Sequence, residues 1–187
     1  LTFTLGDEDD VTGGDSTDTF DFSGVTIPVI RGVDGGGATD VDTIAANNVA
    51  TSWTINGSNA GILQPGISSF GQFTNVENIV GGSSVDTFVF TNSGRLDGSI
   101  DGGAGLDILI GDASGVRVTV TAGLNDSGTI LEEDGTTIKV VNGFTSVENL
   151  TGAGAKDVFV INGTLGGSVT MGGGNDEISF GTAGNVA

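Results

Sequence analysis

Residues 81–90 read Gly-Gly-Ser-Ser-Val-Asp-Thr-Phe-Val-Phe, and a similar order of residue types occurs twice more in the chain. Residues 152–161 read Gly-Ala-Gly-Ala-Lys-Asp-Val-Phe-Val-Ile, and residues 13–22 read Gly-Gly-Asp-Ser-Thr-Asp-Thr-Phe-Asp-Phe. Each copy begins with a glycine-rich turn, because glycine permits positive φ, and then reaches an aspartate. After the aspartate, residue types alternate or stay apolar, which predicts a short β-strand with a buried face.

A second string repeats at a fixed spacing. Residues 73–79 read Phe-Thr-Asn-Val-Glu-Asn-Ile, and residues 144–150 read Phe-Thr-Ser-Val-Glu-Asn-Leu, an offset of 71 positions. The sequence therefore predicts tandem units of about 70 residues. We expect residues 1–73 to form the first unit, 74–144 the second and 145–187 a truncated third, all in one continuous solenoid cut from a longer array.

A second aspartate follows each of the glycine–aspartate turns. The distances are 22 residues from Asp18 to Asp40, 21 from Asp86 to Asp107 and 19 from Asp157 to Asp176. In the first of these copies, Asp42 takes the place of the expected apolar residue. These distances suit one coil of a parallel β-solenoid, in which each coil stacks on the last. We therefore predict an all-β fold, a parallel β-solenoid (β-helix) of short coils with Gly/Asp-rich turns; the alternative is a row of small β-sandwiches.

Several short β-rich runs support this fold, and no long run has helical periodicity. The expected strands are Val25–Ile30, Ser52–Ile55, Asp86–Phe90, Asp107–Ile110, Val116–Val120, Thr136–Val141 and Val158–Ile161. The expected core stacks contain Phe88, Phe90, Phe159 and Ile161.

Composition excludes several functions. The 187 residues include 35 glycines, 24 acidic and only five basic residues, which give a net charge of −19. So few cations cannot form a basic patch, and nucleic acid is therefore not an expected partner. Without histidine or cysteine there is no ordinary zinc site and no imidazole or thiol catalysis. No apolar run approaches the roughly 20 residues that cross a bilayer, so we expect no membrane insertion.

Residues 102–110 fit the pattern Gly-Gly-x-Gly-x-Asp-x-(large apolar)-x at every specified position. This segment resembles the calcium-binding nonapeptide of RTX proteins, which Gram-negative bacteria secrete. In that family calcium lies between turns one coil apart, which suits an ion that takes about six to eight oxygen ligands. The resemblance implies Ca²⁺ sites formed by Asp86 with Asp107, Asp157 with Asp176, and Asp18 with Asp40, together with Gly102, Gly103 and Gly105. Only this copy is complete, because Ser84, Ala155 and Met171 stand where the pattern has glycine. The alternative is that the aspartates only cap backbone N–H groups at tight corners.

The order of motifs along nearly the whole chain also resembles the repeats of large haemagglutinin-like and RTX-like bacterial adhesins. This resemblance implies a secreted, extracellular protein at the cell surface of a Gram-negative-type bacterium. We expect a structural segment of a stalk or self-assembling filament, stiffened by calcium and not an enzyme. Its expected partners are neighbouring repeats or identical chains stacked end to end, with surface glycans as a further candidate.

Other functions remain as alternatives. One is a carbohydrate- or ice-binding module, in which the single Trp53 would stack on a sugar, although core packing is the more usual role of such a residue. A polysaccharide-active β-helix enzyme is less favoured because basic residues are so few. Glu77 and Glu148 could bind a cation, while the asparagines after them are more typical of turn residues that satisfy backbone groups. The acidic run 132–134 is expected to be a solvated loop tip.

Overall fold

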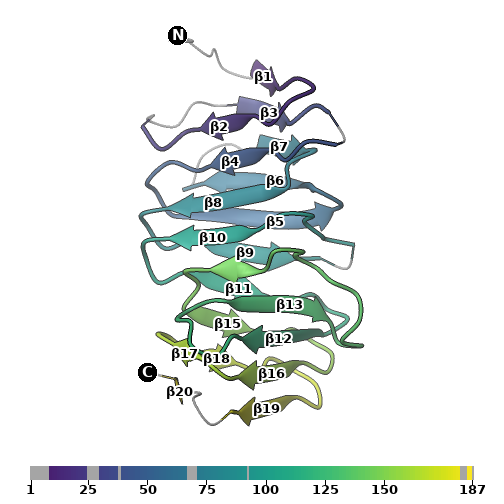
Figure 1. Ribbon diagram of the computed structural model, residues 1–187, viewed down its shortest axis with the longest axis vertical. Coiled ribbons are helices and arrows are strands. Elements are labelled where there is room, and N and C mark those ends of the chain that lie inside the picture. Colours follow the sequence, from purple (N-terminus) through teal and green to yellow (C-terminus); the bar gives the residue numbers. More distant parts are fainter. Residues whose placement is uncertain are drawn as a thin grey trace.

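The structure, a computed structural model, describes residues 9–24, 30–37, 39–66, 71–91, 93–181 and 185–186. These residues form strands, bridges and turns and contain no helix, and hence none that could cross a membrane. Two mixed sheets of nine strands each enclose one hydrophobic core. The strands stack along the long axis of the molecule, from β1 at one end to β19 at the other (Figure 1).

Strand bounds are given in spatial order within each sheet. The first sheet contains β1 (Asp9–Thr12), β3 (Ile30–Asp34), β7 (Gly71–Thr74), β6 (Ala60–Pro65), β5 (Thr51–Gly57), β9 (Thr87–Phe90), β11 (Ile108–Ile110), β15 (Asn149–Thr151) and β18 (Val169–Thr170). The second sheet contains β19 (Glu177–Phe180), β16 (Val158–Ile161), β12 (Val116–Val120), β13 (Gly128–Glu132), β14 (Phe144–Thr145), β10 (Ile100–Gly103), β8 (Asn78–Gly82), β4 (Thr43–Ala45) and β2 (Thr19–Asp21). A separate pair contains β17 (Thr164–Leu165) and β20 (Asn185–Val186).

Consecutive strands mostly alternate between the two sheets. From β7 to β12 the chain changes sheet at every strand, so that β8 pairs with β10 in the second sheet and β9 with β11 in the first. Both of these pairings are parallel. Each sheet contains strands from all three ranges 1–73, 74–144 and 145–187. Two such continuous sheets are not a row of separate small sandwiches.

The sheets are not wholly parallel, because each contains one inserted antiparallel strand. In the first sheet β6 lies antiparallel between β5 and β7, and in the second β13 lies between β12 and β14. The same contact recurs in both insertions. A Cβ on Gly61 would lie 2.2 Å from the carbonyl of Thr54 and 2.6 Å from the ring of Phe73. Gly128 stands in the same relation to Thr119 and Phe144, at 2.1 and 2.9 Å.

The insertions change which sheet receives each repeated motif. Three consecutive strands, β5 to β7, remain in the first sheet, and β12 to β14 remain in the second. Consequently β8, in the string Val-Glu-Asn-Ile, lies in the second sheet, whereas β15, in Val-Glu-Asn-Leu, lies in the first. Segments 71 positions apart in sequence thus occupy opposite sheets.

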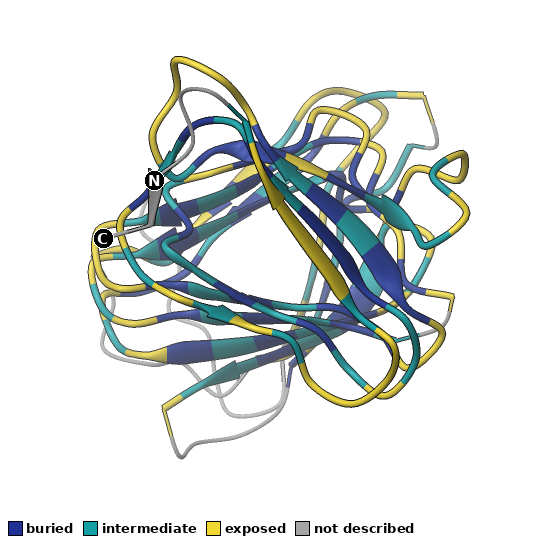
Figure 2. Cartoon of the chain, turned by 90° about the horizontal axis from the view of Figure 1, so that it is seen from below, coloured by how far each residue is buried: buried dark blue, intermediate teal, exposed yellow. Residues whose placement is uncertain are grey.

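The core consists of side chains that stack in register between paired strands. In the first sheet Trp53, Phe88, Leu109 and Leu150 follow one another across β5, β9, β11 and β15. A matching column in the second sheet contains Phe20, Ile44, Ile79, Ile100 and Phe144. Seen along the long axis, most buried positions lie on the strands and most exposed positions lie in the connecting loops, although the end strand β19 is exposed along its length (Figure 2). The expected core residues Phe88, Phe90, Phe159 and Ile161 are all buried.

Most of the strands expected from sequence are present, and one is not. β12 and β16 have the expected bounds. The expected run 52–55 lies within β5, and the runs 86–90 and 107–110 each begin one residue before β9 and β11. The run 136–141 is not a strand, since it makes only single bridges at Ile138 and Val140. Its lysine side chain turns into the interior, where it has polar partners. Of the run 25–30, only Ile30 lies within the described residues.

Two leucines three residues apart allow the effect of core packing on stability to be compared with the effect of a surface side chain. Leu109 is buried, and Leu106 is 58% exposed. We expect Leu109→Ala to lower the free energy of unfolding by about 2–5 kcal/mol, because it leaves a cavity in the column. Leu106→Ala should change it by less than about 0.5 kcal/mol. Chemical denaturation of both variants measures the difference, and equal losses would contradict the assigned core.

Candidate functional site

The recurring chemical feature of the turns is a row of carboxylates that we call the carboxylate ladder. At each step, a side-chain carboxylate accepts a hydrogen bond from the backbone N–H of a residue in the adjacent layer. The N–H to carboxylate pairs are Asp18 to Asp42 (2.7 Å), Asp42 to Glu77 (2.8 Å), Thr51 to Asp86 (2.7 Å), Asp86 to Asp107 (2.7 Å), Asp107 to Glu148 (2.7 Å), Val116 to Asp157 (2.8 Å) and Asp157 to Asp176 (3.0 Å). Because a buried N–H without a partner is costly, the ladder satisfies backbone groups where the chain turns from one sheet to the other.

A glycine five residues earlier leaves room for the carboxylates of Asp18, Asp86, Asp107 and Asp157. A Cβ on Gly102 would lie 1.9 Å from the carbonyl of Ser146 and 2.7 Å from Oδ2 of Asp107. A Cβ on Gly81 would lie 2.4 Å from the carbonyl of Gly102 and 2.5 Å from Oδ2 of Asp86. The glycine and the aspartate therefore occur together because the carboxylate lies against the glycine Cα.

The other two glycines of the complete nonapeptide serve the shape of the turn. Gly103 has a φ of 89°, and Gly105 has a φ of 154°. Both values lie in a region that side chains disfavour. A Cβ on Gly103 would also lie 2.1 Å from the carbonyl of Gly82 in the adjacent layer. All three predicted glycines thus lie where turns from neighbouring layers pack closely.

Four of the six predicted aspartates meet as expected. The N–H of Asp86 reaches Asp107, and the N–H of Asp157 reaches Asp176, so both predicted pairs are adjacent in the ladder. The oxygen Oδ2 of Asp157 also accepts the N–H of Ala153 at 2.8 Å.

The third predicted pair, Asp18 with Asp40, does not form the contact seen in the other two pairs. The N–H of Asp18 donates to Asp42, while the carboxylate of Asp40 folds back against Gly37 of its own loop. A Cβ on Gly35 would meet Asp42 Oδ2 at 2.5 Å, so Asp42 is the residue that corresponds to Asp107. This turn is two residues longer than the others, which moves the aspartate along. Asp42 therefore does not replace an apolar residue; Ile44 fills that core position.

Sequence reasoning also missed that two glutamates belong to the ladder. Glu77 accepts the N–H of Asp42, and Glu148 accepts that of Asp107. The asparagines that follow them accept hydrogen bonds from backbone N–H groups, as expected of turn residues. Asn78 accepts the N–H and hydroxyl of Ser99 at 2.9 and 3.0 Å, and Asn149 does the same for Ser168 at 3.1 Å. The repeated string Val-Glu-Asn is the sequence feature that could have indicated this role of the glutamates.

Burial raises the pKa of four carboxyl groups in the ladder, those of Glu77, Asp86, Asp107 and Asp157. Desolvation, together with the charge of Asp107, raises the pKa of Asp86 to about 7, against hydrogen bonds from Thr51 that lower it. Desolvation and the charges of Glu148 and Asp101 raise the pKa of Asp107 to about 6. Asp157 and Glu77 shift in the same direction, again chiefly through desolvation. The ladder thus holds like charges close together in a poorly solvated place.

The ladder offers calcium some of its preferred ligands. One oxygen, Oδ2, of each of Asp42, Asp86 and Asp107 is buried without a hydrogen-bond partner. Carbonyl oxygens of the next layer lie near the same glycines, and carboxylate and carbonyl oxygens are the ligands that calcium prefers. Within the described ranges, however, no three acidic side chains gather around one point. The fit therefore rests on unpartnered oxygens and not on an acidic cluster.

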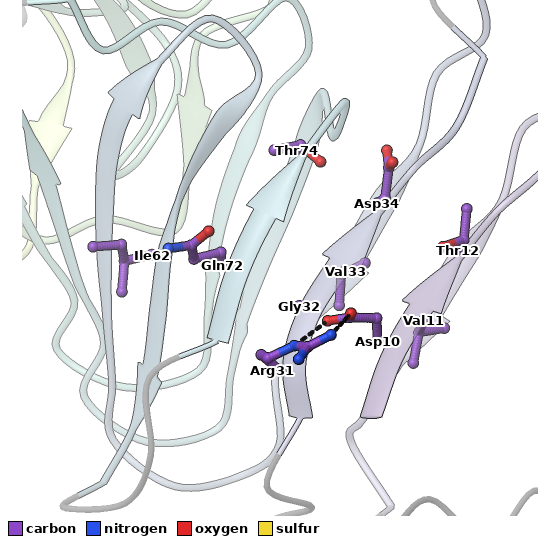
Figure 3. A pocket seen from close by; sticks show the side chains of 10 residues that line it. All are labelled: Asp10, Val11, Thr12, Arg31, Gly32, Val33, Asp34, Ile62, Gln72 and Thr74. Atoms are coloured by element: carbon purple, nitrogen blue, oxygen red, sulfur yellow. Dashed lines mark hydrogen bonds and ion pairs between the residues drawn. The ribbon is translucent and has the colours of Figure 1, made fainter. Parts of the chain in front are cut away.

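A shallow pocket of about 560 Å³ lies on β1, β3, β6 and β7 (Figure 3). Arg31 forms an ion pair with Asp10 there. The lining residues are Asp10, Val11, Thr12, Arg31, Gly32, Val33, Asp34, Ile62, Gln72 and Thr74. These described residues include no aromatic ring on which a sugar could stack. Trp53 is fully buried, stacked on Phe88 with ring centroids 6.2 Å apart, which confirms its core role and excludes it as a sugar platform.

Comparison with known proteins provides no further guide. No family model matches this chain, and no curated protein or solved structure is similar to it.

Two glycines test whether the ladder requires close packing. Gly102→Ala should destabilise the protein by about 1–3 kcal/mol, because the new methyl group collides with backbone and carboxylate oxygens. At Gly154, in another turn, a Cβ would meet nothing within 4 Å. Gly154→Ala should be neutral or stabilising by up to about 1 kcal/mol. Thermal melting compares the two, and a neutral Gly102→Ala would refute the proposed role of the glycine.

Proposed function

We propose that this chain is a structural segment of an elongated, extracellular surface protein of the adhesin or stalk type. In this proposal the two sheets are the two walls of a β-solenoid, and each pair of turns closes one coil. The alternation of strands between sheets, the columns of core side chains and the ladder with about one carboxylate per layer all support it. None of these features forms a substrate pocket, and all of them repeat along one axis.

The observation that carries the proposal is the uncovered end at β18 and β19. Ile178 and Phe180 are 42% and 57% exposed. They pair in register with Phe159 and Ile161, which are fully buried beneath them. In the described part of the chain, no strand pairs with the outer edge of β18 or β19. One more coil would cover these side chains and satisfy the edge, so we propose that neighbouring repeats or identical chains continue the stack.

The charge of the protein suits a long rod. Twenty-four acidic residues against five basic ones repel neighbouring rods from the side and keep them soluble. End-to-end contact is the direction in which core columns continue and backbone edges remain unpaired. Association along the axis is therefore favoured over lateral clustering.

A second candidate function is calcium binding by the ladder. The unpartnered oxygens of Asp42, Asp86 and Asp107 favour it. The residues that would hold the ion are the ladder neighbours Asp86 with Asp107, Asp157 with Asp176, and Asp18 with Asp42. A bound cation would neutralise buried carboxylates and link adjacent layers, which would couple folding to the calcium concentration.

Sedimentation velocity tests the end-to-end stack. We expect the protein to form larger, elongated species as its concentration rises, because stacking buries Ile178 and Phe180. The double variant Ile178→Glu/Phe180→Glu should remain monomeric. The control Val85→Glu/Leu106→Glu places the same two charges on exposed turn residues and should associate like the parent. Association that survives the end variant, or a parent that stays monomeric throughout, would argue against the stack.

Thermal melting against pH tests the ladder and the calcium candidate together. A raised folded-state pKa gives stability that is present below the unfolded value of 3.8 and lost as pH rises through the folded values of about 6 and 7. In EDTA, the melting temperature should therefore fall between about pH 4 and pH 8. Asp86→Asn should flatten part of this fall, and Asp15→Asn, which removes one exposed charge, should not.

Calcium competes with protons for the same oxygens, so it should act mainly at the high-pH end. If the ladder binds calcium, millimolar Ca²⁺ near pH 8 should raise the melting temperature by about 10 °C or more, and Mg²⁺ should not. A melting temperature independent of calcium would leave the aspartates as caps of backbone N–H groups. The rod proposal does not depend on that outcome.

A further inference from the structure

One lysine is buried in a protein that has almost no basic residues. Lys139 is 1% exposed, whereas Arg31, Arg95 and Lys156 form ion pairs at the surface. Lys139 follows β13, between single bridges at Ile138 and Val140 that fix the backbone on both sides. Burial of an ammonium group is expensive unless its surroundings compensate for it.

The end of the Lys139 side chain meets two carboxylates and an aromatic ring. Its Nζ forms ion pairs with Asp112 Oδ2 and, at 2.9 Å, with Glu132 Oε1. Nζ also donates to the carbonyl of Gly94 at 3.4 Å and lies 5.8 Å from the ring centroid of Phe90. A primary amine and a carboxyl group are therefore held together in a nearly dry place, with a second carboxyl group beside them.

The carboxyl group of Asp112 is itself fixed by hydrogen-bond donors. Asp112 is 1% exposed, and its Oδ1 accepts the backbone N–H of Ser114 at 2.8 Å and also the Ser114 hydroxyl. The same hydroxyl lies 3.3 Å from Glu132 Oε2. Two donors thus point at Oδ1 while the amine lies at Oδ2. This arrangement would stabilise negative charge on Oδ1 when a nucleophile attacks the carbon between the two oxygens.

We propose that Lys139 and Asp112 condense to form an intramolecular amide bond, with Glu132 as the group that transfers the protons. The amine Nζ attacks Cγ of Asp112, the N–C bond forms, and the Cγ–Oδ2 bond breaks. Oδ2 leaves as water after it has gained protons that Nζ loses through Glu132. The balance is one amine and one carboxylic acid giving one amide and one water, and no oxidant or other reactant is required.

Three features of the surroundings act on this step. The reaction needs the neutral amine and the neutral acid, which burial alone favours over two charged groups. Burial raises the pKa of Asp112, but hydrogen bonds from Lys139 and Ser114 outweigh burial and leave this pKa below its ordinary value. A proton must therefore pass from Nζ to the carboxyl group, and Glu132 contacts Nζ and shares the Ser114 hydroxyl with Asp112. The Glu132 side chain is 24% exposed, which gives protons and the released water a route outward. Fixed proximity lowers the entropic part of the barrier to attack.

Asp112 is favoured over Glu132 as the partner in the bond. Both carboxylates touch Nζ, but only that of Asp112 is fully buried and fixed at its other oxygen by a backbone N–H. The product would join the end of β11 to the segment after β13 and so close a covalent loop around the β12–β13 hairpin. This inference does not rest on the proposed function.

Mass spectrometry of the denatured, purified protein tests the bond without any variant. The expected intact mass is that of the sequence minus one water molecule. Trypsin cleaves after Arg95, Arg117, Lys139 and Lys156, but an amide on Lys139 blocks cleavage there. The digest should therefore contain peptide 96–117 linked to an uncut peptide 118–156. Lys156, exposed and in surface ion pairs, is the internal control and should be cleaved.

Several results would overturn the proposal. A full mass with cleavage after Lys139 would show an ion pair only. An unlinked peptide 118–156 that has lost water and is not cleaved after Lys139 would place the bond on Glu132. Water loss at an Asp-Gly sequence, with cleavage after Lys139 and no linked peptides, would indicate an aspartyl succinimide. Glu132→Gln should keep the fold, measured by circular dichroism, and have the full mass. Water loss that persists in Glu132→Gln would refute the role of Glu132, and Lys156→Gln should retain the loss.

Discussion

The hydrogen bond from a backbone N–H to a carboxylate in the next layer determines how this chain can turn. Where the chain leaves one sheet for the other, the N–H at the corner has no partner strand, and leaving it unpaired in the interior would cost about 1–3 kcal/mol. Asp107 and its equivalents accept these N–H groups at 2.7–3.0 Å. A carboxylate in that position requires a residue without a side chain opposite it, which explains Gly102. The recurrence of glycine with aspartate in these turns follows from one contact made at successive layers.

This solution places negative charges next to one another. Asp86, Asp107 and Asp157 are all buried, and each pKa is raised. A neutral amide would accept the same N–H without the repulsion between charges. The use of carboxylates therefore adds a response to protons, and in the calcium proposal to cations, that the turn geometry alone does not need. The proposed rod would be most sensitive to its ionic surroundings at its interior corners, and much less so at its exposed charges, which solvent screens.

The sequence predicts the all-β fold, the buried Phe88 and Phe159, and two of the three aspartate pairs, because these follow from local alternation and regular spacing. It misplaces the third pair, since two extra residues in the turn after Gly35 move the aspartate from position 40 to 42. The antiparallel strands β6 and β13 were also missed, because strand direction depends on partners distant in sequence. The run 132–134 reads as an acidic loop tip, yet Glu132 pairs with the buried Lys139, and no local pattern indicates that contact.

The two inserted hairpins show why that contact matters to the architecture. Both place a glycine beneath a phenylalanine ring, at Gly61 and at Gly128, so their backbone packing is the same. The first is then held by aromatic contacts, with Trp53 edge-on to Phe73 at 6.1 Å. Near the second, the partners are the buried ammonium of Lys139, the buried carboxylate of Asp112 and the partly exposed carboxylate of Glu132. Buried charges stabilise a fold less well than apolar side chains of similar size, because their desolvation offsets their attraction. The second hairpin therefore gains least from its polar cluster if the cluster stays ionic, and most if the charges are removed by a bond between them.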